Sequence, residues 1–116
     1  MVDTLIEKIT PKKILVYMDE YGNEPYTQWF IGLRDKKSKS RIESRLQRLA
    51  AGLYGDCESV GEGVFELRMF FWPGYRVYFG EDAENIVVLL CGGDKSSQKR
   101  DIKMAKAYWQ EYKING

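Results

Sequence analysis

Three cationic side chains lie in or directly after predicted strands that a sheet could bring together. Arg68 lies in an alternating stretch at residues 64–69, Arg76 lies in the stretch that follows a Trp-Pro-Gly turn, and Lys95 follows an apolar run at residues 86–91. A guanidinium presents a planar fork of donors, so two of them on adjacent strands can grip a phosphate or a carboxylate. We therefore predict an anion site, most simply a phosphate site, built from Arg68, Arg76 and Lys95.

Such a site could support cleavage of a phosphodiester. The chain has no histidine, so proton transfer near neutral pH would fall to Glu, Asp, Lys or Tyr. Clustered cations would balance the charge that grows on the phosphate oxygens when a ribose 2′-OH attacks. Glu66 could act as a base, Lys95 could transfer a proton, and Tyr78 could orient the substrate or stack on a base. The pattern also fits a simpler interpretation, in which Arg68 pairs with Glu66 on a solvated sheet face.

Further basic residues cluster in two predicted helices, although the net charge of the whole chain is only +1. They could contact phosphates of RNA or of the ribosome, or an acidic partner protein, or they could simply form solvated helix faces. The residues predicted to contact RNA are Lys36, Lys37, Lys39, Arg41, Arg45 and Arg48 in the first group, and Lys99 and Arg100 in the second.

Hydrophobic periodicity predicts one α+β domain that spans residues 1–116. Apolar residues with helical spacing follow Pro25 and Asp35, whereas a period of two marks the segments on either side of the Trp-Pro-Gly turn. The apolar run at 86–91 predicts a central strand that is covered on both faces. The predicted order is β-α-α-β-β-β-α, with strands near 14–18, 64–69, 75–79 and 86–91 and a mainly antiparallel sheet packed against the helices.

Several kinds of site and location are disfavoured by the sequence. Cys57 and Cys91 have no nearby cysteine or histidine partner, which favours a reducing cytoplasm over a disulfide-stabilised secreted protein. The N-terminal segment lacks the apolar core of a signal peptide, and no apolar run is long enough to cross a membrane. No spacing of His, Cys or carboxylate ligands suggests a metal. We therefore expect a cytoplasmic protein without a cofactor or a membrane partner.

Five ordered motifs resemble those of addiction-module killer proteins, which belong to the RelE/ParE superfamily of type II toxin–antitoxin toxins, near the HigB and phage Gp49-like branch. The resemblance spans nearly the whole chain. The motifs are EPYTQWFIGLRD at 24–35, RIESRLQRLAAGLYGD at 41–56, GVFELR at 63–68, PGYRVYFG at 73–80 and LLCGGDKSSQKRDIKMA at 89–105.

This resemblance implies a RelE-like fold and a bacterial cytoplasmic toxin that is neutralised by a cognate antitoxin, often a helix-turn-helix protein. Such a toxin meets DNA only indirectly, through its antitoxin. RelE-like members cut mRNA on the ribosome without a metal, whereas ParE-like members poison DNA gyrase. A domain that only binds the antitoxin is a further alternative.

By position, Arg76 matches an arginine that RelE-type toxins use at the scissile phosphate, Arg68 matches a neighbouring strand arginine, and Lys95 falls near a basic residue after the last central strand. The chain departs from its ribosome-dependent relatives at two strand positions. It has Val64 and Glu66 where those relatives carry lysines. It also has Ile102 near the place of a tyrosine, and it lacks the histidines of related HigB enzymes.

Overall fold

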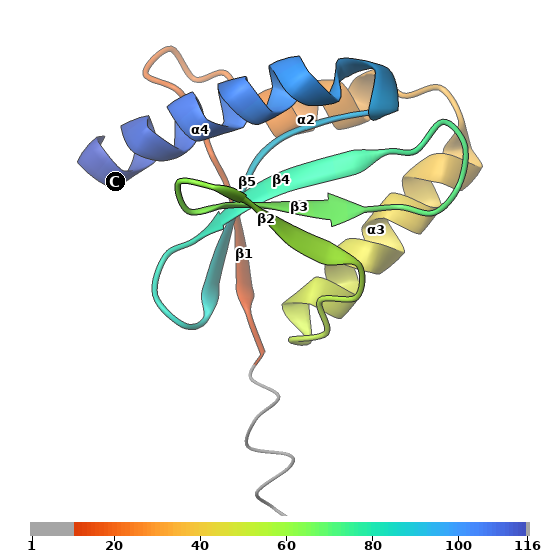
Figure 1. Ribbon diagram of the computed structural model, residues 1–116, viewed down its shortest axis with the longest axis horizontal. Coiled ribbons are helices and arrows are strands. Elements are labelled where there is room, and N and C mark those ends of the chain that lie inside the picture. The colour runs from red at the N-terminus through yellow and green to blue at the C-terminus, as the bar shows by residue number, and fades with distance from the viewer. Residues whose placement is uncertain (1–10, 116) are drawn as a thin grey trace, which may run out of the picture.

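A five-stranded mixed sheet forms the centre of the protein in the computed structural model, which describes residues 11–115 (Figure 1). The N-terminal segment, for which we expect no signal peptide, lies mostly outside these residues. The strands lie in the order β1-β5-β4-β3-β2, and β1 and β5 are parallel while the other neighbours are antiparallel. The strands are β1 (Lys13–Val16), β2 (Cys57–Gly61), β3 (Val64–Arg68), β4 (Arg76–Glu81) and β5 (Ile86–Gly93).

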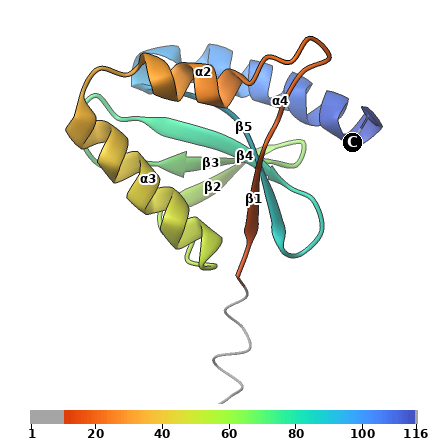
Figure 2. The ribbon, with the colours of Figure 1, turned by 180° about the vertical axis from the view of Figure 1, so that it is seen from behind.

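Helices cover both faces of this sheet (Figure 2). The helices are α2 (Pro25–Gly32), α3 (Lys36–Ala50) and α4 (Gln98–Asn115), and a short 3₁₀ turn, η1 (Lys95–Ser97), precedes α4. α2 and α3 pack on the face that carries Leu67, Val77 and Phe79. α4 packs on the opposite face through Ala105 and Trp109. The α+β class and the mainly antiparallel sheet are therefore confirmed.

The predicted element order is wrong by one strand, because β2 was not predicted. The observed order over the described residues is β-α-α-β-β-β-β-α. β2 has the sequence CESVG, which lacks the apolar alternation of its neighbours, and it forms the edge of the sheet with most residues exposed or half-buried. An edge strand pairs on one side only and needs no regular apolar alternation, so its sequence predicts a strand only weakly. β2 is nevertheless important, since it brings Glu58 beside β3.

Local sequence explains where the helices begin and why β5 is central. Pro25 occupies the first turn of α2, and the side chain of Asp35 accepts a hydrogen bond from the backbone N–H of Lys37 at the start of α3. β5 lies between β1 and β4 and is buried along most of its length, as its unbroken apolar sequence predicts. Glycine allows α4 to approach the sheet closely, because a Cβ added at Gly80 would lie 2.5 Å from the ring of Trp109.

Candidate anion site at the ends of β3, β4 and β5

The register of β3 and β4 places the predicted catalytic side chains on one face of the sheet. Arg68 lies directly opposite Arg76, and Glu66 lies opposite Tyr78. Tyr78 belongs to the apolar cluster beneath α4, so this is the face that α4 covers. The two strand arginines therefore lie on the same face of the sheet as cross-strand neighbours. The predicted contact of Glu66 and Tyr78 with a substrate is wrong in this structure, because α4 and its first residues lie over both side chains.

Glu66 is buried and is held by several donors. Its carboxylate accepts hydrogen bonds from the Tyr78 hydroxyl at 2.9 Å and from Gln98 Nε2 at 2.8 Å. Arg76 Nε lies 3.5 Å from the same carboxylate, and Arg68 Nη1 lies 3.9 Å from it. A carboxylate with this many partners and almost no exposed surface cannot reach a substrate directly. In this structure Glu66 therefore positions the two arginines.

Tyr78 is also fully buried. Its burial and its hydrogen bond to the Glu66 carboxylate raise the pKa of the phenol well above its ordinary value. The hydroxyl therefore stays protonated over the physiological pH range and donates to Glu66. A base of the substrate cannot stack on its ring unless α4 moves away.

Arg68 is balanced by acidic residues from the neighbouring segment. Its Nη2 lies 3.2 Å from Asp56 Oδ1, and it also pairs with Glu58 of β2. These carboxylates, together with Glu66, neutralise the guanidinium at a half-exposed place. An incoming phosphate would have to compete with them, so Arg68 is less available to an anion than the sequence predicts.

Arg76 and Lys95 both lie beside Gly74, in the turn that joins β3 and β4. Arg76 Nη1 donates to the Gly74 carbonyl at 2.7 Å. A Cβ added at Gly74 would lie 3.3 Å from Arg76 Nη1 and 3.6 Å from Lys95 Cβ, so the Arg76 guanidinium and the base of the Lys95 side chain both lie beside this glycine. Arg76 Nε is buried and makes no hydrogen bond within residues 11–115. Lys95 is exposed.

An open hollow of about 770 Å³ is lined by Trp72, Pro73, Tyr75, Asp94, Lys95 and Ser96, whereas Arg76 lies outside this lining. Asp94 places one negative charge in the hollow, and its carboxylate accepts from the Ser96 backbone N–H at 2.8 Å. The hydrogen bonds from Ser96 lower the pKa of this carboxyl. The cations Arg76 and Lys95 therefore define the best candidate anion site.

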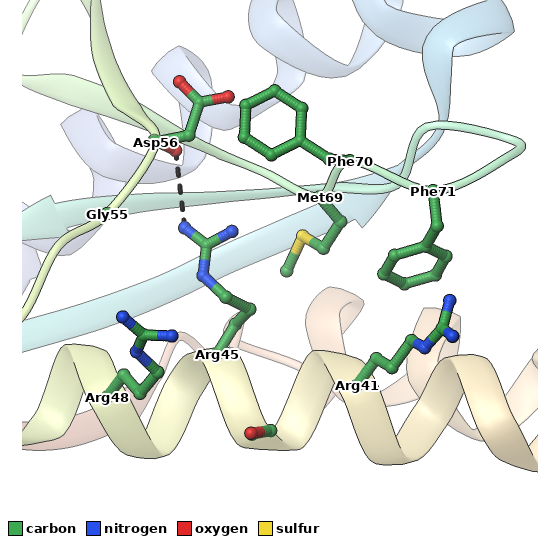
Figure 3. Close-up of a pocket in the computed structure, with 9 residues that line it drawn as sticks. Arg41, Arg45, Arg48, Gly55, Asp56, Met69, Phe70 and Phe71 are labelled. Carbon is green, nitrogen blue, oxygen red and sulfur yellow. Dashed lines mark hydrogen bonds between the residues drawn. The ribbon is translucent and has the colours of Figure 1, made fainter.

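The basic residues of α3 lie elsewhere. Figure 3 shows Arg41, Arg45 and Arg48 of α3 beside a pocket that Met69, Phe70 and Phe71 line from the other side. Ser44, Gly55 and Asp56 also line this pocket, whose volume is about 410 Å³. The guanidinium of Arg41 lies 4.9 Å from the centre of the Phe71 ring, a cation–π contact.

Arg45 has a structural role in this pocket (Figure 3). Its Nη2 donates to the backbone carbonyls of Tyr54 at 3.2 Å and Asp56 at 3.5 Å, and its Nη1 donates to the carbonyl of Arg68. Arg45 thus holds the segment before β2 against the end of β3. Arg48 is exposed at the rim of the same pocket.

The remaining predicted RNA-contacting residues divide between the two regions. Lys36 and Lys37 are exposed in the first turn of α3, and Lys39 lies over the ring of Phe30 at 5.4 Å. Lys99 and Arg100 are exposed at the start of α4, close in sequence to Lys95. The structure therefore brings the second basic group, and not the first, to the neighbourhood of the candidate anion site.

Other reactive groups of the described residues are less suited to catalysis than the candidate anion site. Over residues 11–115, no three His, Cys, Asp or Glu side chains are arranged to hold a metal ion. Burial raises the pKa of Cys91 to about 12, which makes this thiol a poor nucleophile. No helix in the described part of the chain is long and apolar enough to cross a bilayer.

Sequence reasoning missed four residues that shape the site: Asp56, Glu58, Trp72 and Gln98. Asp56 and Glu58 come from a strand that was not predicted, so nothing placed them beside Arg68. Gln98 reaches Glu66 from the first residue of α4, a contact between residues far apart in sequence. Trp72 had a weak signal, since it immediately precedes the Pro-Gly turn, where a side chain projects from the sheet.

Comparison with curated proteins identified a similar chain from Haemophilus influenzae. It is described only as an uncharacterized protein, and it is 45% identical over 86 residues, which cover 74% of this chain and 87% of the other. No family model matches the sequence.

Proposed function

The chain belongs to one family with this Haemophilus influenzae protein, and we propose that it is a toxin of a type II toxin–antitoxin module with a RelE-like fold. Its activity is metal-independent cleavage of mRNA on the ribosome, in the cytoplasm. A cognate antitoxin, of the helix-turn-helix type, neutralises it. The proposal extends the RelE/ParE resemblance of five motifs, and the site geometry supports its chemistry.

The observation that carries the proposal is that the Arg76 guanidinium and the base of Lys95 both lie beside Gly74, while Lys95 also lines an open hollow. A fixed guanidinium and an exposed ammonium are the groups that stabilise charge on a phosphate. Arg76 is held by the Gly74 carbonyl on one side and by Glu66 on the other, so its position is set before a substrate arrives.

The reaction follows from RNA chemistry. The ribose 2′-oxygen attacks the neighbouring phosphorus, a new P–O2′ bond forms, and the P–O5′ bond breaks. The 2′-OH proton is lost to solvent or a base, and the departing 5′-oxygen gains one. The products are a 2′,3′-cyclic phosphate and a 5′-OH. Arg76 stabilises the non-bridging oxygens, and Lys95, at the exposed side, donates to the departing oxygen.

A second function is favoured by a specific observation. Glu66 and Tyr78 are buried, and Arg68 is paired with carboxylates, so few groups are free for acid–base chemistry. A ParE-like inhibitor of DNA gyrase needs a docking surface and no such groups. Because ribosome-dependent cleavage relies mainly on positioning and charge, and Arg76 and Lys95 supply both, we place the nuclease first.

Controlled expression in a bacterial host distinguishes these functions. We expect the wild-type protein to stop growth and protein synthesis with truncated messages, and Arg76→Ala to be harmless while it still folds and still binds its antitoxin. Arg48→Ala, at the rim of the α3 pocket, is the matched control and should remain toxic. An SOS response with broken DNA and intact mRNA would favour the gyrase function, and growth unaffected by wild-type expression would leave only an antitoxin-binding role.

A further inference from the structure

Two large aromatic side chains project from the turn at residues 69–75. Phe70 is 87% exposed and Trp72 is 90% exposed. Exposure of so much apolar surface is unfavourable unless a ligand or partner covers it. The two residues face different surroundings, because Phe70 lines the pocket beside α3 and Trp72 lines the hollow that contains Lys95. Trp72 therefore stands beside the candidate anion site.

The hollow beside Trp72 continues along the start of α4. Ser96 lines this hollow and also a second one of about 600 Å³, whose remaining lining is Ser97, Lys99, Arg100 and Lys103. A single surface path thus leads from an aromatic ring, past Lys95, to three further cations and two hydroxyl groups.

The cations on this path are largely free. Over residues 11–115, Lys95, Lys99 and Lys103 have no carboxylate within 4.0 Å, and the nearest carboxylate oxygen to Arg100 Nε is that of Asp101 at 3.8 Å. Asp94, the acidic residue on the path, directs its carboxylate to the backbone of Ser96. The cations Lys95, Lys99, Arg100 and Lys103 outnumber the carboxylates of Asp94 and Asp101, so the net charge along this path is positive.

A flat exposed ring followed by a row of cations matches a single-stranded nucleotide chain, in which bases stack on aromatic rings and phosphates contact Lys and Arg. A protein partner would be better matched by a contiguous apolar patch, whereas beyond Pro73 and Tyr75 the residues along this path are charged or hydroxyl-bearing. We propose that Trp72 stacks on a base of single-stranded RNA and that Lys99, Arg100 and Lys103 bind the phosphates that follow it. This inference rests on the proposed function, because the RNA bound at Trp72 would be the substrate that reaches Arg76 and Lys95.

Tryptophan fluorescence gives a direct readout. Of the three tryptophans, Trp72 is fully exposed, Trp109 is buried and Trp29 is half-buried against the core. We expect a ten-nucleotide oligoadenylate to quench the emission of the wild-type protein. Binding of the same oligonucleotide with a fluorescent label should weaken by about 5- to 150-fold in Trp72→Ala, the range known for loss of one stacked base. Trp72→Phe should retain most of the affinity.

Two controls isolate the path. Phe70→Ala removes an equally exposed ring from the same turn and should leave RNA affinity unchanged. Lys99→Gln with Lys103→Gln should weaken binding and should reduce the slope of log affinity against log salt by about 1.4, the effect of two lost phosphate contacts.

The inference is overturned if the folded Trp72→Ala variant binds the labelled RNA as tightly as the wild type. It is also overturned if RNA does not bind the wild type, or if Trp72→Ala weakens binding of the antitoxin alone, which would assign the surface to a protein. RNA that binds through Trp72 but is never cut on ribosomes would instead support this inference and remove the nuclease function.

Discussion

Replacement of Glu66 tests how the negative charge of this buried carboxylate affects anion binding at Arg76. Its carboxylate lies 3.5 Å from Arg76 Nε, on the buried side of the guanidinium. A phosphate on the open side would lie roughly 7 Å from Glu66, two contacts of about 3.5 Å. Two unit charges at that distance repel by about 2 kcal/mol at an effective dielectric constant of about 20. Water on the open side of the phosphate reduces this repulsion, and about 1 kcal/mol remains.

Glu66→Gln removes this repulsion while it keeps the shape of the side chain. Arg76 should stay in place, because its bond to the Gly74 carbonyl is kept and the amide oxygen of a glutamine can still face Arg76 Nε. We therefore expect the variant to bind RNA about fivefold more tightly at low salt. The same change weakens the hydrogen bonds from Tyr78 and Gln98, so the free energy of unfolding should fall by about 1 to 3 kcal/mol.

Binding of a labelled oligoribonucleotide, followed by fluorescence anisotropy, measures the change in affinity. Glu58→Gln is the matched control, since Glu58 is exposed and contacts Arg68 but not Arg76. It should leave the affinity nearly unchanged. An affinity of Glu66→Gln equal to or below that of the wild type would show that no anion binds at Arg76, and that the Arg76–Glu66 pair only stabilises the fold.

Three further predictions concern the scaffold. Gly80→Ala should lower the free energy of unfolding in urea by about 1 to 3 kcal/mol, because the new methyl group would overlap the buried Trp109 ring. Unchanged stability would contradict this packing. Arg45→Met should cost about 1 to 3 kcal/mol through lost bonds to backbone carbonyls, and an unaltered urea midpoint would refute its structural role. Burial raises the thiol pKa of Cys57 to about 11 and of Cys91 to about 12, so both thiols stay neutral in the folded protein at pH values where those of the unfolded chain, with an ordinary pKa of 9.0, ionise. The free energy of unfolding should therefore fall as pH rises from 9 toward 12, and Cys91→Ala should flatten that fall; equal slopes for both proteins would contradict it.

The sequence predicts the parts of this fold that depend on local pattern. A period of two in residues 64–69 and 75–79 indicates β3 and β4, and the unbroken apolar run indicates β5 as a central strand. The pairing of Arg68 with Arg76 then follows, because a hairpin places one residue opposite the other. This register is why the two arginines could be assigned to one face before the structure was known.

The features that the sequence did not predict depend on contacts between segments that are far apart in the chain. β2 has no alternating apolar residues, so its pairing with β3 is decided by the chain reversal between the two strands and not by its own pattern. Burial of Glu66 depends on the path of α4, which brings Gln98 over it. A sequence gives the polar character of a sheet face, but it does not show whether a later helix will cover that face.

Cleavage of mRNA in a purified system tests the central claim most directly. Ribosomes programmed with a short message and carrying an empty A site would be mixed with the wild-type protein, with Arg76→Ala and with Arg48→Ala, and the 5′ ends of the fragments would be mapped. The wild type and Arg48→Ala should cut within the A-site codon and leave 5′-OH ends, whereas Arg76→Ala should leave the message intact. Uncut message with the wild-type protein, or equal cutting by a folded Arg76→Ala variant, would contradict the role of Arg76 as the phosphate-binding residue of a ribosome-dependent nuclease.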